Sequence, residues 1–150
     1  MLFEDTFTVR APVGDVWAFL RDPERVAPCI PGTERIEVID DRHYRVTAGA
    51  RVSLLSVSFA LDVTVTEIDE PRRLVSLAEG MDPRIKERVK LSSALALEPR
   101  GPDATEVSYT IDLTVFGKLA SLGFAVIKGK AKHMAADFAT CIRTLLEAAA

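Results

Sequence analysis

The last third of the chain carries an amphipathic helical pattern, which constrains the fold more than any other feature. From Gly117 to the end of the chain, apolar residues recur at steps of three and four, as on one stripe of a 3.6-residue helix. The stripe consists of Leu119, Leu122, Val126, Met134, Phe138, Cys141, Ile142 and Leu145. The pattern predicts one continuous helix of roughly 45 Å at 1.5 Å per residue. No other segment has the length to cover such a helix, so a sheet must do so.

Alternation of apolar and polar residues in the rest of the chain predicts the strands of that sheet. The connections between alternating segments are short, and parallel neighbours need a dozen or more connecting residues, so the strands should pair antiparallel. We expect about seven strands, near residues 3–9, 36–38, 44–52, 54–68, 73–78, 85–97 and 105–115, with turns that include residues 80–83 and 99–102.

Two short helices should interrupt the sheet after the first strand. Pro12 suits the first turn of a helix that runs to Arg21, and Asp22 can cap a second helix over residues 24–27. A stiff turn over residues 28–32 then leads back into strands. The fold class is therefore α+β: a curved antiparallel sheet around a long C-terminal helix. A strongly bent sheet can leave an apolar hollow beneath its helix, and such hollows hold small apolar molecules.

Length and composition limit the class of protein. The 150 residues fit one domain, 1–150, and the 48% apolar and 27% charged shares are those of a globular protein. No apolar run reaches the length of a membrane span. The formal net charge of −3 argues against a nucleic-acid binder. The N-terminus has no basic segment before an apolar core, which predicts a cytoplasmic protein without a secretory signal.

The two cysteines, Cys29 and Cys141, have no metal-ligand spacing. In a cytoplasmic chain we expect both to be free thiols, with Cys141 in the core and Cys29 a small buried residue of the turn. The three alanines at residues 148–150 should fray.

Candidate acids, bases and nucleophiles do not converge. His43 lies beside a turn and His133 lies near the polar side of the helix, so both should be surface residues. We expect no catalytic set, no metal site and no cofactor. The polar groups that share the inward phase of their strands are Tyr44, Glu87, Ser93 and Tyr109, each of which either is satisfied within the core or contacts a ligand.

The inward positions define a candidate ligand-binding set, which also includes the first half of the long helix. Its members are Trp17, Leu20, Ile30, Tyr44, Val46, Phe59, Leu61, Val63, Glu87, Leu91, Ser93, Tyr109, Ile111, Leu119, Leu122, Gly123 and Val126. Trp17 either lines the mouth of the pocket or packs the first helix.

Glycines divide the helix into two parts. Gly117, Gly123 and Gly129 fall in its first half, and each interior glycine costs about 1 kcal/mol relative to alanine. They mark either close approach to the sheet or a soft segment that moves to admit a ligand. We expect the first half to be the lid and the second half, around Phe138, Ile142 and Leu145, to anchor the fold. A bulky residue in place of Gly123 should then impair ligand uptake more than stability.

A local basic cluster also falls on this helix, at Lys128, Lys130, Lys132 and His133. Such a cluster is either a solvated face or a contact for anionic lipid head groups or an acidic partner.

The order of these elements resembles the START-related helix-grip superfamily (SRPBCC) typified by the birch-pollen allergen. Several motifs are similar to the CoxG family of carbon monoxide dehydrogenase subunits. They are Ala-Pro-Val at 11–13 with Val16-Trp17, Asp-Pro-Glu at 22–24, Cys-Ile-Pro-Gly at 29–32, and Gly-Lys-Leu-Ala at 117–120 with Leu122-Gly123. The segment at 81–86 replaces a glycine-rich stretch of the family's middle strands.

The resemblance implies a non-enzymatic domain that binds an isoprenoid quinone or lipid between sheet and helix. It also implies an accessory or recruitment role beside a molybdenum-containing carbon monoxide dehydrogenase, with a peripheral contact at the inner face of the membrane. Two alternatives stay open. One is a polyketide cyclase or hydratase that uses Tyr44, Tyr109 or Glu87 as acid or base, and the other is a structural assembly factor. A homodimer also stays open.

Overall fold

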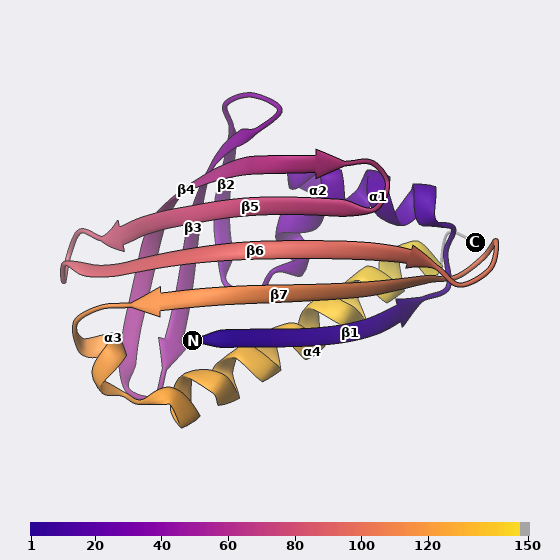
Figure 1. Ribbon diagram of the computed structural model, residues 1–150. Coiled ribbons are helices and arrows are strands. Elements are labelled where there is room, and N and C mark those ends of the chain that lie inside the picture. Colours follow the sequence, from indigo (N-terminus) through magenta and orange to yellow (C-terminus); the bar gives the residue numbers. More distant parts are fainter. Residues whose placement is uncertain (148–150) are drawn as a thin grey trace.

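A seven-stranded antiparallel sheet curves around a C-terminal helix in the computed structural model, which describes residues 1–147 (Figure 1). The predicted α+β class is confirmed; the expected fraying of residues 148–150 lies outside the described residues. The strands follow the order β1-β7-β6-β5-β4-β3-β2. The elements are β1 (Leu2–Val9), α1 (Val13–Arg21), α2 (Pro23–Val26), η1 (Ala27–Cys29), β2 (Thr33–Val38), β3 (His43–Val52), β4 (Leu55–Asp69), β5 (Arg73–Asp82), β6 (Glu87–Pro99), β7 (Thr105–Val115), α3 (Lys118–Ser121) and α4 (Phe124–Glu147).

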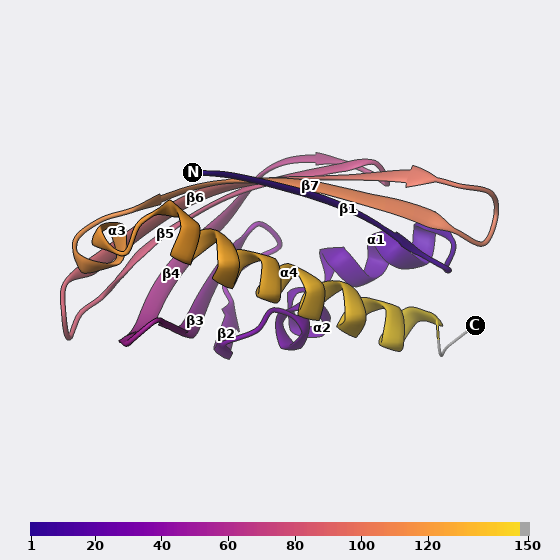
Figure 2. The same ribbon diagram turned by 90° about the horizontal axis from the view of Figure 1, so that it is seen from below.

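The helices lie on one face of the sheet, which is the concave face (Figures 1 and 2). Pro12 is the N-cap residue of α1, and the Asp22 side chain caps α2 by accepting from the Glu24 backbone N–H at 3.1 Å. Both features agree with the local sequence signals. Within residues 1–147, no helix is both long and apolar enough to span a bilayer.

Strand register places the alternating apolar residues together on the concave face. Val46 lies opposite Leu61, and Leu91 lies opposite Leu113. The predicted connection between the fifth and sixth strands is wrong. β5 continues past Ala78 to Asp82, because Gly80 pairs with Leu61 inside the ladder and does not form a turn, and β6 begins at Glu87 and not at residue 85. The turn to β6 follows at residues 83–86.

The predicted single C-terminal helix is wrong at its start. The chain forms the short helix α3, breaks at Leu122 and Gly123, and starts α4 at Phe124. Gly123 has φ = +89°, a left-handed conformation that glycine adopts without steric cost. The break changes the helical phase, so Val126 is 42% exposed while Ile127 is buried.

The second half of α4 packs on the sheet through a stripe centred on Ala139, Ile142 and Leu146, all of which are buried. Leu145 lies at the edge of this stripe and is 50% exposed, so its predicted anchoring role is wrong. Phe138 is half-buried and meets Phe7 of β1 edge to face, with ring centroids 6.2 Å apart.

The two cysteines form a disulfide between η1 and α4, so the expectation of two free thiols is wrong. Their Cα atoms lie 5.4 Å apart although 112 residues separate them in sequence. The pairing depends on the packing of α4 against η1, which no local pattern reports.

Buried apolar residues form two separate core clusters. The first core joins β1, α1, η1 and the second half of α4, and it includes Val9, Val16, Phe19, Val107 and Ile142. The second core lies at the other end of the sheet, where α3 closes it, and consists of Val52, Val57, Phe59, Val89 and Leu119.

Candidate ligand-binding site

The middle of the concave face lies between the two cores and belongs to neither. Val46, Val63, Leu91 and Ile111 all point to this face, yet each is only half-buried and none packs in either cluster. Inward-facing apolar side chains that keep accessible surface indicate unfilled space beside them. Ser93 lies in the same strip, opposite Ser76 of β5, and is also half-buried.

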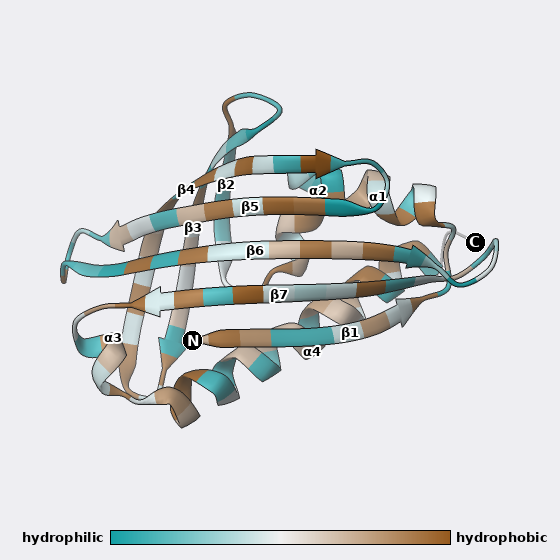
Figure 3. Ribbon diagram, in the orientation of Figure 1, coloured by the Kyte–Doolittle hydropathy of each residue, from teal (hydrophilic) through white to brown (hydrophobic). Residues whose placement is uncertain are grey.

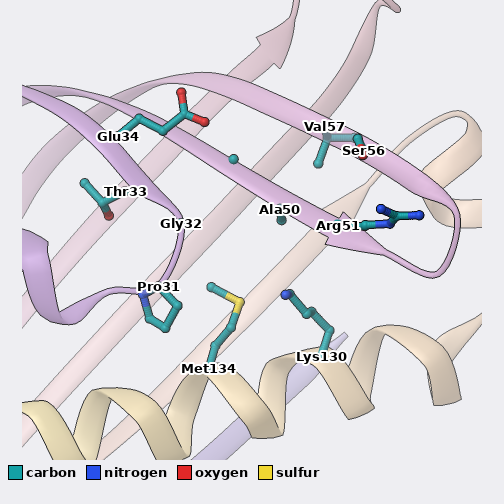
Figure 4. Close-up of a pocket in the computed structure, with 11 residues that line it drawn as sticks. Pro31, Gly32, Thr33, Glu34, Ala50, Arg51, Ser56, Val57, Lys130 and Met134 are labelled. Carbon is teal, nitrogen blue, oxygen red and sulfur yellow. The ribbon is translucent and has the colours of Figure 1, made fainter.

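A pocket of about 420 Å³ opens beside this strip, between the edge formed by β2 and β3 and the first half of α4 (Figure 4). Ala50 lies four residues along β3 from Val46 on the same face, so the pocket adjoins the apolar middle. Its lining consists of Pro31, Gly32, Thr33, Glu34, Gly49, Ala50, Arg51, Ser56, Val57, Lys130 and Met134. None of these residues belongs to the predicted set, because α4 meets β3 and η1 through contacts that are distant in sequence.

A second cavity of about 580 Å³ lies between α1 and the turn from β4 to β5. It is lined by Gly14, Trp17, Ala18, Arg21, Ile68, Glu70 and Pro71. Trp17 is the member of the predicted set found here, but it is only 5% exposed and packs in the first core.

The other apolar members of the predicted set divide among three environments. Leu20 lies in the first core, Phe59 and Leu119 lie in the second, and Leu61 and Leu122 pack against the second. Ile30, Gly123 and Val126 are exposed. The hydrophobic colouring of the ribbon shows the apolar positions running through the strands (Figure 3). The structure therefore brings Val46, Val63, Leu91, Ser93 and Ile111 together, with Leu61 at their border.

Each of the two tyrosine hydroxyls has a hydrogen-bond partner within the protein, and the two residues lie far from each other. The Tyr44 hydroxyl donates to the Asp41 carbonyl at 3.3 Å, and the Tyr109 hydroxyl lies 3.5 Å from a carboxylate oxygen of Asp5. Burial, and then the nearby Asp5 charge, raises the pKa of Tyr109 to about 12. Four strand steps separate β3 from β7; at about 4.8 Å per step this is roughly 19 Å. The tyrosines therefore cannot act together on one small reacting group.

Glu87 is buried as its phase predicts, but its carboxylate is occupied. It accepts from the backbone N–H groups of Lys118 and Leu119, at 2.8 and 3.3 Å. A carboxylate that satisfies the free N–H groups at a helix start is a structural cap. Glu87 thus holds α3 against the start of β6. The three acid or base candidates of the enzymatic alternative do not meet.

Asp82, which has no side-chain exposure, is a structural residue that the sequence patterns do not reveal. Its carboxylate accepts from the Arg84 guanidinium at 2.9 Å and from the Ser58 backbone N–H at 2.9 Å. The Arg84 hydrogen bond, followed by that from Ser58, lowers the pKa of Asp82 to about 2. This residue fastens the turn between β5 and β6 to β4.

A curved antiparallel sheet, two short helices after its first strand and a C-terminal helix across its concave face define the START-related helix-grip class. Solved structures agree with this arrangement. A conserved protein from Geobacillus kaustophilus aligns at 24% identity and a TM-score of 0.89, over 98% of this chain and 95% of that chain. A START superfamily protein from Mycobacterium smegmatis aligns at 14% identity and a TM-score of 0.74, over 99% of each chain.

A further similar fold is the Zhui aromatase/cyclase from Streptomyces sp. R1128, at 17% identity and a TM-score of 0.68, over 98% of this chain and 93% of that chain. A comparison with curated proteins gave no match. The profile of the CoxG family of carbon monoxide dehydrogenase subunits matches residues 6–147, and the chain belongs to this family. The resemblance seen in the sequence motifs is confirmed.

Proposed function

We propose that this protein is a non-enzymatic carrier that holds a hydrophobic molecule, an isoprenoid quinone or a lipid, between the concave face of the sheet and α4. One observation carries the proposal: Val46, Val63, Leu91 and Ile111 face inward, keep accessible surface and lie outside both cores. A ligand in this strip would join the two cores into one apolar interior and remove that surface from water. Membership of the CoxG family supports a ligand-binding domain.

The same membership supports an accessory or recruitment role for a molybdenum-containing carbon monoxide dehydrogenase-type enzyme. In this proposal the carrier works in the cytoplasm and exchanges its ligand at the inner face of the membrane. Co-purification of the dehydrogenase with the tagged protein from its native host tests the partner. Recovery of the protein with its apolar ligand but without that enzyme would contradict the proposed partner and would still support the carrier function.

Filling the apolar strip tests the ligand site directly. Leu91→Phe adds volume in the middle of the concave face, whereas Leu77→Phe adds the same kind of side chain on the convex face, where Leu77 is 47% exposed. Native mass spectrometry of the gently purified protein should find an apolar ligand. Added isoprenoid quinone should also quench the fluorescence of Trp17, the single tryptophan.

Leu91→Phe should weaken quinone or lipid binding severalfold, and Leu77→Phe should leave it unchanged. Equal binding by both variants would place the ligand elsewhere. Failure to detect any ligand by either method would contradict the carrier function.

A further inference from the structure

Two serine side chains lie next to each other in the middle of the concave face. Ser76 of β5 and Ser93 of β6 are directly opposite in the ladder, and the next pair along the same face is Ala78 with Leu91. Directly opposite residues of an antiparallel pair have Cβ atoms about 4.5–5.5 Å apart. One ligand atom above the sheet can therefore lie within hydrogen-bond distance of both hydroxyls.

Both hydroxyls are free and accessible. The Oγ atoms of Ser76 and Ser93 make no hydrogen bond with any of residues 1–147. Among the described residues that are not exposed, Thr33 Oγ1 is the one unpaired side-chain oxygen or nitrogen atom with almost no accessible surface. The two serine Oγ atoms therefore keep accessible surface, although each serine is half-buried. A molecule bound on the concave face can reach both.

The residues around the serine pair are all apolar. Across the sheet, Val65 lies opposite Ser76 and Ile111 lies opposite Ser93. Along the strands, the flanking pairs on the same face are Ala78 with Leu91 and Leu74 with Leu95. An ion placed among these six neighbours would lose hydration without gaining a counter-charge. The pair therefore suits an uncharged polar atom that has apolar groups of the same molecule on both sides.

The long helix spans the strands that contain the serines. α4 packs on β1 and on β3, which lie on opposite sides of β5 and β6 in the strand order. Figure 2 shows the sheet arched over the helix. The accessible Oγ atoms thus face the space between the sheet and α4, where the carrier function places the ligand.

We propose that Ser76 and Ser93 bind one carbonyl oxygen of a quinone ring, with both hydroxyls donating to it. A carbonyl oxygen has two lone pairs and no charge, so it can accept from both serines at once. The carbon atoms of the ring then contact Leu91 and Ile111 on either side. This inference rests on the proposed carrier function and narrows its ligand from a quinone or a lipid to a quinone.

Menadione and 2-methylnaphthalene test the role of the carbonyl group, because they share the same fused rings and methyl group and differ in the two carbonyl oxygens. Both are titrated into the full chain by calorimetry. The ratio of the menadione affinity to the 2-methylnaphthalene affinity should fall at least about tenfold in Ser76→Ala/Ser93→Ala, because each lost hydrogen bond is worth about 1 kcal/mol.

Ser92→Ala is the matched control. Ser92 is the neighbour of Ser93 in β6 and is also half-buried, but it lies opposite Leu77 on the convex face. This variant should keep the affinity ratio of the wild type. The free Ser76→Ala/Ser93→Ala protein should melt at the same temperature as the wild type or higher, because the hydroxyls that it loses have no partner in the protein. A lower melting temperature with an unchanged ratio would show that the hydroxyls are structural and overturn the site.

Infrared difference spectroscopy of bound menadione gives an independent test, because a hydrogen bond to a carbonyl oxygen lowers its stretching frequency. The band should lie at lower frequency in the wild type and Ser92→Ala than in Ser76→Ala/Ser93→Ala. The same frequency in all three proteins would overturn the site.

The outcomes separate the two proposals. An affinity ratio that responds equally to Ser76→Ala/Ser93→Ala and Ser92→Ala would overturn the serine site and leave the carrier function intact. Binding of an isoprenoid quinone without binding of menadione would do the same, because recognition would then depend on the tail. Binding of no quinone, together with no apolar ligand in the purified protein, would overturn both.

Discussion

At the residue scale, the disulfide between Cys29 and Cys141 is the strongest single constraint on the fold. It closes a loop of 112 residues and ties η1, next to the pocket, to the second half of α4. A loop of this length removes much conformational entropy from the unfolded chain, which corresponds to about 2–5 kcal/mol of stability.

Reduction with dithiothreitol, or the variant Cys141→Ala, should therefore lower the free energy of unfolding by about 2–5 kcal/mol, measured by chemical denaturation. The double variant Cys29→Ala/Cys141→Ala should not respond to reductant, which separates the bond from other effects of the reagent. Two thiols that react in the denatured, unreduced protein would show that the bond does not form.

Asp82 gives the protein a specific acid response. Its pKa is lowered from 3.8 to about 2 by Arg84 and the Ser58 N–H, so the folded state prefers the ionised form. A group whose pKa is depressed on folding stabilises the protein above its unfolded value, and this contribution is lost as the pH falls from about 4 to about 2.

Melting temperatures of the wild type and Asp82→Asn between pH 7 and pH 2 test this assignment. The wild type should be more stable at neutral pH, and the difference should shrink below pH 4. Asp103→Asn, in an exposed turn, is the control and should follow the wild type at every pH. A difference that stays constant down to pH 2 would mean that Asp82 acts through packing and not through its charge.

At the element scale, the junction of α3 and α4 revises the role expected for Gly123. With φ = +89° any L residue is strained there, although the space around a Cβ atom is open. Gly129 has similar open space but lies inside α4. The two glycines therefore form a matched pair that differs in backbone conformation.

Gly123→Ala should destabilise the protein by about 1–2 kcal/mol because of left-handed strain. Gly129→Ala should stabilise it by about 1 kcal/mol through helix propensity. Thermal denaturation of both variants checks the signs. If Gly123→Ala were as stable as the wild type, the junction would adopt another conformation.

Local sequence patterns predict the elements well and the contacts between them poorly. Strict alternation around Phe59 and Leu91 is a property of neighbouring residues, so strands and their inward faces could be predicted. The pairing of Cys29 with Cys141, and the meeting of the β2–β3 edge with Lys130 around one pocket, depend on how α4 packs against β3 and η1. The prediction that Val126 faces the sheet was wrong for a similar reason. The break at Gly123 separates α3 from α4, so residues after it do not continue the 3.6-residue repeat that starts at Gly117. The apolar strip of the candidate site could thus be predicted, whereas the pocket beside it could not.

At the scale of the whole molecule, charge is unevenly distributed. Residues 113–136 contain no Asp or Glu but include four lysines, although the whole chain has a net charge of −3. In the same region Phe116, Phe124 and Val126 are between 42% and 49% exposed. Exposed apolar side chains among lysines suit the surface of an anionic bilayer, which supports the proposed peripheral membrane contact.

The double variant Phe116→Ser/Val126→Ser should reduce co-sedimentation with vesicles rich in phosphatidylglycerol severalfold. Leu145→Ser, exposed at the other end of α4, should leave it unchanged. Vesicles of phosphatidylcholine alone should bind weakly in every case. If Phe116→Ser/Val126→Ser and Leu145→Ser reduced co-sedimentation equally, the surface around Phe116 and Val126 would not be the membrane contact.

The division of the interior into two cores has a consequence for motion. The first core contains the disulfide and the fully buried Ile142, whereas the second is closed by α3 and the Glu87 cap. Amide hydrogens near α3 and the hairpin of β3 and β4 should therefore exchange with deuterium sooner than those of β1, β7 and the end of α4. A ligand could then leave through partial unfolding of one end while the crosslinked end keeps its structure, and the protein would not have to unfold globally to release its cargo.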